Sequence, residues 1–157
     1  MSANKKLILM RHAKSSWKFP ELSDHQRPLN KRGIRDAPRM GSFLQKSDYI
    51  PDLILVSTAK RTLQTLEHLG KHFQDIPKKI ISNLYHANLE DLLTEIHQIP
   101  IGKTAMIIGH NPGLEILIDR LTKENHIMPT ASVAIVEQKK QKWMVREILK
   151  PKEIFSD

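Results

Sequence analysis

Cysteine is absent from the 157 residues of the chain. Its absence excludes disulfide bonds, zinc sites built from thiolates, and every enzyme class that relies on a cysteine nucleophile. The chain also lacks an apolar run long enough to cross a bilayer, and its polar start has no signal-peptide core. We therefore expect a cytoplasmic protein with no membrane partner.

The composition is that of an ordinary globular protein, with 39% hydrophobic and 27% charged residues. No low-complexity tract or internal repeat indicates disorder or a solenoid. A chain of this length fits one compact core and leaves little room for another. We expect residues 1–157 to form a single domain that folds alone, as a monomer.

The formal net charge of +8 indicates an anionic partner, such as nucleic acid, acidic lipid or a phosphorylated substrate. Lysines are spread over separate segments, at residues 5–6, 78–79 and 139–142. Aromatic residues make up only 5% of the chain, and none lies between these lysines as a base-stacking platform. We therefore expect no nucleic-acid partner.

Short apolar runs alternate with helical patterns along the first two thirds of the chain. An alternation of this kind predicts an α/β fold, a three-layer sandwich whose mostly parallel sheet has helices on both faces. The expected buried strands are residues 7–10, 53–56 and 105–108, with a short strand at 79–81, and the expected helices are 30–46, 59–73 and 89–99.

Two features complicate this simple alternation. Pro38 lies inside the first helical pattern, so that helix either kinks there or becomes regular only from about Asp36. Near the end of the chain, residues 132–137 and 142–149 have strand patterns joined by a polar stretch, which predicts a hairpin. The hairpin would add at least one antiparallel strand to the sheet.

Basic residues follow each of the three main apolar runs directly. Arg11 and His12 follow the first, Arg61 closes a short segment after the second, and His110 and Asn111 follow the third. Ligands of open α/β sheets bind beyond the carboxyl ends of the strands, so these side chains should converge. Arginines and histidines gain nothing from meeting without an anion, which predicts a bound phosphate or carboxylate.

The side chains at these strand ends suit a phosphoryl group. Arg11 and Arg61 offer paired donors that match phosphoryl oxygens. Asn111 and Pro112 read as the cap and first residue of a helix, whose N-terminus beside His110 would also favour an anion. A metal is disfavoured, because neither His12 nor His110 has a carboxylate or second histidine at ligand spacing. We expect no metal and no organic cofactor.

At these positions the sequence resembles the histidine phosphatase superfamily, also called phosphoglycerate mutase-like, and especially its SixA-type phosphohistidine phosphatases. The resemblance covers most of the chain. It rests on Arg11-His12-Ala13, which has alanine where the family signature has glycine, on residues 57–61, and on residues 109–112; residues 27–33 and 84–87 indicate the SixA type.

The resemblance implies a phosphatase that hydrolyses phosphohistidine on a protein. In that reaction His12 attacks phosphorus, a phosphohistidine enzyme forms, and water hydrolyses it, while Arg11, Arg61 and His110 stabilise the phosphoryl oxygens. The residues fit this chemistry, because neighbouring arginines disfavour the charged form of an attacking imidazole. Asn111 is a further phosphate-binding candidate.

A general acid for the leaving group is not evident in the sequence. Asn111 stands where the acid phosphatases of the family have aspartate, and Glu90 reads more readily as a solvated charge at a helix start. A missing acid would favour phosphohistidine, because imidazole leaves more easily than an alkoxide. The alternatives are a small-molecule phosphomonoesterase on the same scaffold and a non-catalytic module that binds phosphorylated protein or nucleic acid.

The segment of residues 13–26 directly follows the candidate nucleophile and contains Trp17 and Phe19. It reads either as a rim or lid of the site or as a cover for the end of the sheet.

Overall fold

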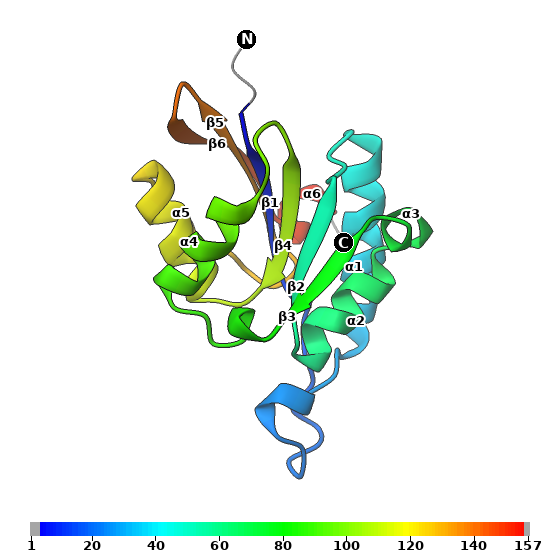
Figure 1. Cartoon of the computed structure of the whole chain (residues 1–157). Helices are drawn as coiled ribbons and strands as arrows, with labels where there is room; N and C mark the ends of the chain where they lie inside the picture. The colour runs from blue at the N-terminus through cyan, green and yellow to red at the C-terminus, as the bar shows by residue number, and fades with distance from the viewer. Residues whose placement is uncertain (1–3, 156–157) are drawn as a thin grey trace.

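A computed structural model describes residues 4–155 and contains one six-stranded sheet (Figure 1). The order of strands across the sheet is β3-β2-β4-β1-β5-β6. The β1, β2, β3 and β4 strands pair in parallel, whereas β5 runs antiparallel to β1 and β6 antiparallel to β5. The strands are β1 (Lys6–Arg11), β2 (Leu53–Ser57), β3 (Lys78–Ile81), β4 (Thr104–Gly109), β5 (Val133–Lys139) and β6 (Lys142–Leu149).

Helices cover both faces of this sheet, as the sequence predicts (Figure 1). One face carries α1, α2 and α3, and the opposite face carries α4 and α5. The helices are α1 (Lys31–Lys46), α2 (Lys60–His68), α3 (Lys71–Gln74), α4 (Leu89–Gln98), α5 (Gly113–Thr122) and α6 (Pro151–Ile154), with short 3-10 turns at Asp24–Gln26 and Ser82–Leu84.

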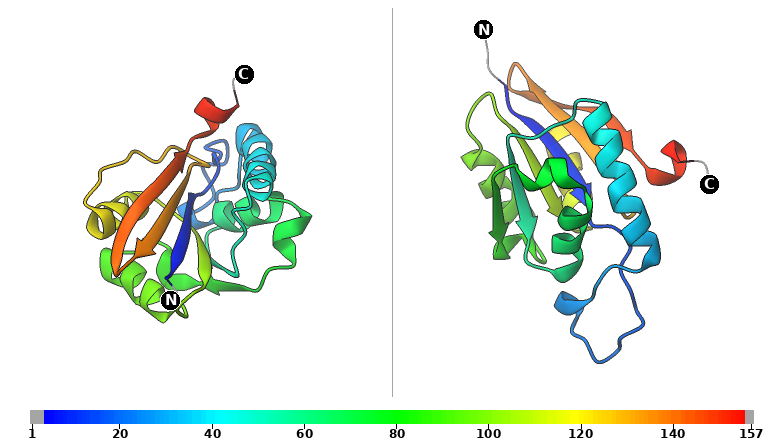
Figure 2. Two further views of the ribbon diagram at one scale, coloured as in Figure 1. Left: turned by 90° about the horizontal axis from the view of Figure 1, so that it is seen from above. Right: turned by 90° about the vertical axis from the view of Figure 1, so that its right-hand side faces the viewer.

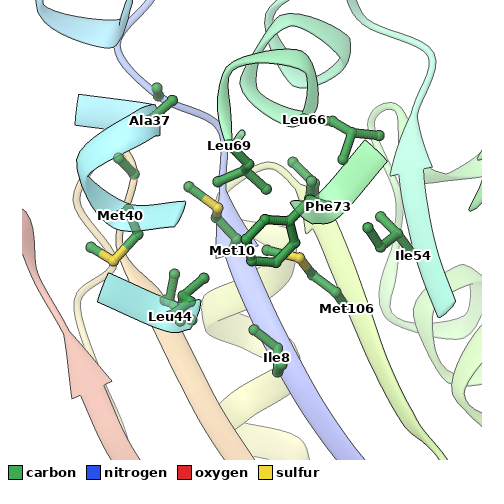
Figure 3. Close-up of a cluster of buried hydrophobic side chains, with 14 of the residues drawn as sticks. Ile8, Met10, Ala37, Met40, Leu44, Ile54, Leu66, Leu69, Phe73 and Met106 are labelled. Atoms are coloured by element: carbon green, nitrogen blue, oxygen red, sulfur yellow. The ribbon is translucent and has the colours of Figure 1, made fainter. Parts of the chain in front are cut away.

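Alternate residues of the central strands build the two apolar layers. In β1, Ile8 and Met10 face α1, α2 and α3, where they pack with Met40 and Phe73 (Figure 3). The intervening Leu7 and Leu9 of β1 lie in the other core cluster, with side chains from α4 and α5. Each such fully buried side chain stabilises the fold by about 1.5–3 kcal/mol. Strands buried on both faces explain the continuous apolar runs in the sequence.

The predicted helix at residues 59–73 is wrong in one respect, because the structure divides it into α2 and α3. Gly70 lies between them with φ +118°, a conformation that residues with a side chain rarely adopt. The apolar periodicity continues across the break, since Leu69 and Phe73 both remain buried. Pro38 is accommodated differently: α1 runs unbroken from Lys31 through Pro38, and Asn30 caps it by accepting a hydrogen bond from Gly33 N at 2.9 Å.

The predicted hairpin is confirmed. Its strands β5 and β6 are joined by Lys140 and Gln141, whose φ values of +50° and +68° fit the tight turns that connect antiparallel strands. The pairing of β5 with the central strand β1 brings the hairpin into the main sheet. The mixed sheet and the helices on both faces therefore agree with the predicted fold class.

The segment between β1 and α1 projects beyond the carboxyl ends of the parallel strands. It extends past the sheet at the lower end of the molecule in Figure 1, and the side view in Figure 2 shows the same projection. A backbone pairing between Ser15 and Leu29 closes its base. This placement puts the loop at the edge where the candidate site residues gather.

Within residues 4–155, no helix has the length and apolarity needed to cross a membrane.

Candidate active site

The carboxyl ends of β1, β2 and β4 bring the predicted site residues together. Arg11 at the end of β1 pairs with Gly109 at the end of β4, so His12 and His110 follow neighbouring positions. A cavity of about 220 Å³ opens there. Its lining contains all five predicted site residues, others from the loop of residues 13–27, and one residue before β5: Arg11, His12, Lys14, Ser15, Trp17, Arg27, Arg61, His110, Asn111 and Thr130.

The ring of His12 is fixed by its own backbone. Its Nδ1 lies 2.7 Å from the carbonyl oxygen of Ala13, and since a carbonyl can only accept, Nδ1 must carry the hydrogen. The next peptide is also held, because Ala13 N donates to Thr65 Oγ1 at 2.9 Å. In a neutral imidazole the lone pair then belongs to Nε2, for which the described residues provide no hydrogen-bond partner.

The surroundings of His12 keep its ring neutral. Burial lowers the pKa of His12 to about 4, and the positive charges of Arg61, Arg11 and Arg27 act in the same direction. The hydrogen bond to Ala13 opposes this shift without overcoming it. At neutral pH, His12 therefore presents an unprotonated Nε2 within a positively charged cavity, as a nucleophile toward an anion requires.

His110 is held by a side chain from the neighbouring strand. Its Nε2 lies 2.8 Å from Ser57 Oγ, at the end of β2. Burial lowers the pKa of His110 to about 3, and His12 and Arg61 contribute to the decrease. Nδ1 of His110 is buried and finds no hydrogen-bond partner among residues 4–155. Both histidines of the site are therefore neutral at physiological pH.

Arg11 and Asn111 share one acceptor. Arg11 Nη1 donates to the carbonyl oxygen of Met128 at 3.1 Å, and Asn111 Nδ2 donates to the same oxygen at 2.7 Å. Arg11 Nε and Asn111 Oδ1 are buried and have no hydrogen-bond partner within the part of the chain that the structure describes. An unpaired guanidinium donor in a basic cavity is the kind of group that a bound anion would satisfy.

The prediction that Asn111 caps a helix is wrong. The α5 helix begins only at Gly113, Pro112 occupies its cap position, and no side chain caps it. The side-chain amide of Asn111 donates instead to the carbonyl oxygen of Met128, which also accepts from Arg11. Asn111 therefore remains in the lining of the cavity, but with a role in holding the loop before β5.

Arg61 reaches the cavity from the first turn of α2, and it is nearly buried, with 6% of its surface exposed. Its guanidinium donates to Asp24 twice, to the backbone oxygen at 2.7 Å and to Oδ2 at 3.0 Å. Two of its five N–H groups are used in this way. Arg61 thus joins α2 to the loop of residues 13–27 while lining the cavity that contains His12.

Arg27 and Asp24 were not identified as site residues from the sequence. Arg27 lines the same cavity and donates to Ser15 Oγ at 2.7 Å and to Asp24 Oδ1 at 3.1 Å. The only sequence signal was the segment 27–33, which indicated the SixA type without assigning a role. Both residues lie in a loop, where patterns of strands and helices give no information on convergence.

Asp24 is the centre of this network. Besides Arg27 and Arg61, Tyr85 donates to it, from its hydroxyl to Oδ2 at 2.6 Å. These hydrogen bonds, first of all that of Tyr85 and then those of the arginines, hold the pKa of Asp24 far below its usual range. The side chain nevertheless remains 43% exposed, so an ionised carboxylate lies at the mouth of the site.

Trp17 shows whether the segment of residues 13–26 borders the site or covers the end of the sheet. Its side chain is 76% exposed, so it does not cover the end of the sheet. The guanidinium carbon of Arg27 lies 3.3 Å from the centre of its ring, and Trp17 lines the cavity that holds His12. The loop therefore forms a rim of the cavity.

Glu90, the weak candidate for a general acid, is exposed on α4 and does not line this cavity.

Among residues 4–155, no three histidine, aspartate or glutamate side chains gather closely enough to hold a metal ion.

Comparison with known proteins agrees with this geometry. The family model of the histidine phosphatase superfamily (branch 1) matches residues 7–90, a range that includes His12, Arg27 and Arg61. A chloroplastic protein of Arabidopsis thaliana, itself uncharacterised, is 32% identical over 153 residues, with 90% of this chain and 70% of the relative covered.

Solved structures match over nearly the whole chain. The SixA protein of Agrobacterium tumefaciens, assigned as a phosphohistidine phosphatase, has 31% identity and a TM-score of 0.84, covering 93% of this chain and 97% of the other. The protein histidine phosphatase SixA in complex with tungstate has 19% identity, a TM-score of 0.83 and coverage of 95% and 99%, and shows the same fold. Together with the family match, these comparisons show that the chain belongs to the histidine phosphatase superfamily.

Proposed function

We propose that this protein hydrolyses phosphohistidine on another protein, by way of a covalent phosphohistidine on His12. Membership of the superfamily supports phosphatase activity in general. The finer proposal depends on one observation: His12 has a neutral ring whose Nε2 is unpartnered, in a cavity lined by three arginines. The likeness to SixA proteins supports the substrate class.

In the first step the lone pair of His12 Nε2 attacks phosphorus, and the bond from phosphorus to the leaving group breaks. Arg11, Arg27 and Arg61 line the cavity where the phosphoryl oxygens would lie, and they would stabilise the charge on those oxygens. His110, neutral and beside His12, would add a hydrogen bond to the same group. Water then hydrolyses the phosphorylated His12 and releases phosphate.

An open cavity suits a protein substrate. The rim is a single exposed loop with Trp17, Phe19 and Glu21 on its surface, so a phosphorylated side chain on another protein can approach without a deep channel. A phosphorylated imidazole is also a substrate that needs little acid assistance, and Glu90 lies outside the His12 cavity. These two points favour phosphohistidine over alkyl phosphates.

The decisive experiment compares a protein carrying phosphohistidine with 4-nitrophenyl phosphate, using the wild type and His12→Ala. The wild type should hydrolyse phosphohistidine with the higher kcat/KM, and brief incubation with labelled substrate should leave acid-labile phosphate on the enzyme. His12→Ala should neither turn over substrate nor retain the label. Labelled phosphate on the His12→Ala protein would show that another residue is the nucleophile.

A further inference from the structure

A second cavity, of about 380 Å³, adjoins the one that holds His12. The two share Arg61, His110 and Asn111 as a common wall. The rest of its lining combines buried leucines with two more exposed polar residues, Asp24 and His86. The apolar lining consists of Leu84, Ala87, Leu92, Pro112 and Leu114 together with Gly109 and Gly113.

The shared wall gives this second cavity a place in the reaction. A phosphoryl group bound by Arg61 in the first cavity would carry its leaving group next to the same guanidinium. The second cavity is the enclosed space on that side, and its volume exceeds that of a single imidazole ring. Its apolar lining suits a flat ring, and its only ionised carboxylate is Asp24.

A carboxylate at an anion site needs a physical reason, because it repels the phosphate that the arginines attract. Asp24 partly serves to hold Arg27 and Arg61, each of which donates to it. Arg11, Arg27, Arg61 and Lys14 line the His12 cavity, so one carboxylate still leaves the site with an excess of positive charge. Neutral side chains could also hold the arginines, so this structural purpose alone does not explain a charged group that is 43% exposed.

The hydrogen bonds of Asp24 leave it one free acceptor position. A carboxylate accepts about four hydrogen bonds, two at each oxygen. Among residues 4–155, Oδ2 accepts from Arg61 and Tyr85, whereas Oδ1 accepts only from Arg27. Oδ1 can therefore accept one more hydrogen bond. The Asp24 side chain is partly exposed to solvent and lines the second cavity, so a ligand in that cavity could donate it.

We propose that Asp24 and the second cavity form a leaving-group subsite that selects a protonated imidazole, a proposal that rests on the function proposed above. The ring nitrogen of the substrate that is not bonded to phosphorus would donate its N–H to Asp24. When the bond between phosphorus and nitrogen breaks, its electron pair stays on the departing nitrogen. The lone pair of His12 Nε2 forms the new bond to phosphorus.

Protonation decides how easily the imidazole leaves. With a proton on its distal nitrogen, the ring departs as neutral imidazole, whereas without that proton it must depart as an anion. Asp24 keeps its own charge throughout and favours the protonated ring through a charge-assisted hydrogen bond. A phenol or an alcohol has no such N–H, so Asp24 offers it no assistance. Asp24 is thereby a specificity-determining residue, distinct from the arginines that hold the phosphoryl group.

The test compares Asp24→Asn with the wild type on a phosphohistidine peptide and on 4-nitrophenyl phosphate. Loss of the charge-assisted hydrogen bond should lower kcat/KM for phosphohistidine about 10- to 100-fold. The rate on 4-nitrophenyl phosphate should fall by a clearly smaller factor, since that substrate donates no hydrogen bond to Asp24 and loses only the support that Asp24 gives to Arg27 and Arg61. Glu21→Gln is the matched control, because it removes an exposed carboxylate from the same loop and should alter neither rate.

Two results with Asp24→Asn would overturn the proposal. An equal loss on both substrates would mean that Asp24 only positions Arg27 and Arg61, and no loss on either would mean that it has no role. Ala87→Leu provides a second measurement, because a larger side chain in the second cavity should impair phosphohistidine turnover while leaving tungstate binding intact. Unchanged phosphohistidine turnover in this variant would exclude the cavity as the leaving-group subsite.

A binding measurement separates this proposal from the proposed function. If the wild type failed to hydrolyse phosphohistidine, the function would be wrong, but the subsite could still be tested with tungstate and imidazole. Imidazole titrated by NMR at pH 6 should bind the tungstate-loaded wild type several-fold more tightly than tungstate-loaded Asp24→Asn. Equal affinities, or no binding of imidazole to the wild type, would refute the subsite.

Discussion

The rings of His12 and His110 lie with their centroids 5.4 Å apart and their planes inclined by 54°. Their proximity means that a proton on one ring opposes a proton on the other, and the pKa of His110 is lowered first by burial and then by His12. The site therefore places two neutral imidazoles among three permanently charged arginines. Positive charge in this site comes from the three arginines and Lys14, and the two histidines add none at neutral pH.

The first prediction concerns the pH dependence of catalysis. Because the pKa of His12 is lowered to about 4, its nucleophilic form persists well below pH 6.5. After correction for ionisation of the substrate, kcat/KM for 4-nitrophenyl phosphate should decrease only as the pH approaches about 4. Arg27→Gln removes one of the charges that lower this pKa, so its profile should move to higher pH. If kcat/KM of the wild type already decreased near pH 6.5, the lowered pKa of His12 would be contradicted.

The second prediction concerns stability. Folded-state pKa values of about 4 for His12 and about 3 for His110 lie below the ordinary value of 6.5. The unfolded chain therefore binds protons first as the pH falls, and stability that is fully present above pH 6.5 is lost below it. Each histidine should contribute a loss of about 1.4 kcal/mol per pH unit in the free energy of unfolding.

Urea unfolding at pH 7.5, 5.5 and 4.5 measures this loss. His110→Asn should show a smaller decrease than the wild type over the same range, since one of the two titrating groups is gone. Identical pH dependence in the two proteins would mean that His110 titrates normally in the folded state.

The third prediction is that phosphate analogues bind in the His12 cavity. Tungstate or vanadate should inhibit hydrolysis competitively, and a concentration of 100 Kd should stabilise the folded protein by about 2.7 kcal/mol. Arg27→Ala should weaken the binding of the analogue, since Arg27 lines the cavity and would donate hydrogen bonds to the bound oxyanion.

The chelator EDTA should leave the activity unchanged. Activity lost in EDTA and restored by a metal ion would contradict this expectation.

The fourth prediction is that loss of Arg61 lowers activity, whereas loss of an arginine outside the site does not. Arg61→Ala should lower kcat/KM about 10²- to 10³-fold, because it removes a donor to the phosphoryl group and also the anchor of Asp24. Arg61→Lys should restore little, since a lysine cannot contact both groups with a planar fork. Arg146→Ala is the control, because it removes an exposed arginine of β6 that pairs with Glu137 of β5, and it should retain full activity.

The fifth prediction is that Glu90 has no catalytic role. Glu90→Gln should leave kcat/KM unchanged on both aryl and alkyl phosphates, because the residue is exposed on α4 and lies outside the His12 cavity. Without an acid, rates across a series of phosphate monoesters should fall steeply as the pKa of the leaving alcohol rises. Equal rates on aryl and alkyl esters would reveal an acid elsewhere, and a selective loss in Glu90→Gln would identify it.

Regular elements explain what could be predicted from the sequence. The apolar runs that end at Arg11, Ser57 and Gly109 have the signature of buried parallel strands, and strand ends converge whatever the loops do. Convergence of His12, Arg61 and His110 followed from that rule. The break at Gly70 was missed because a glycine inside a periodic pattern is compatible with a continuous helix.

The loop residues could not be placed in this way. Asp24 meets Tyr85 and Arg61 from distant positions in the chain, and no periodicity predicts which side of a loop faces inward. Asn111 shows the opposite failure, since an Asn-Pro pair before an apolar run is a common helix start. Its amide binds Met128, a partner that only the tertiary structure reveals.

The pairing of β1 with β4 also determines when this protein can become active. Arg11 and Gly109 are register partners, although most of the chain separates them in sequence. His12 follows β1 directly, yet it lacks the neighbouring strand until residue 109 has been made, and β5 adds a further partner of β1 after residue 133. Contacts between distant segments form late and slowly. A truncated chain that ends before β4 therefore carries His12 without the strand that lies beside it, and we expect such a fragment to have no phosphatase activity.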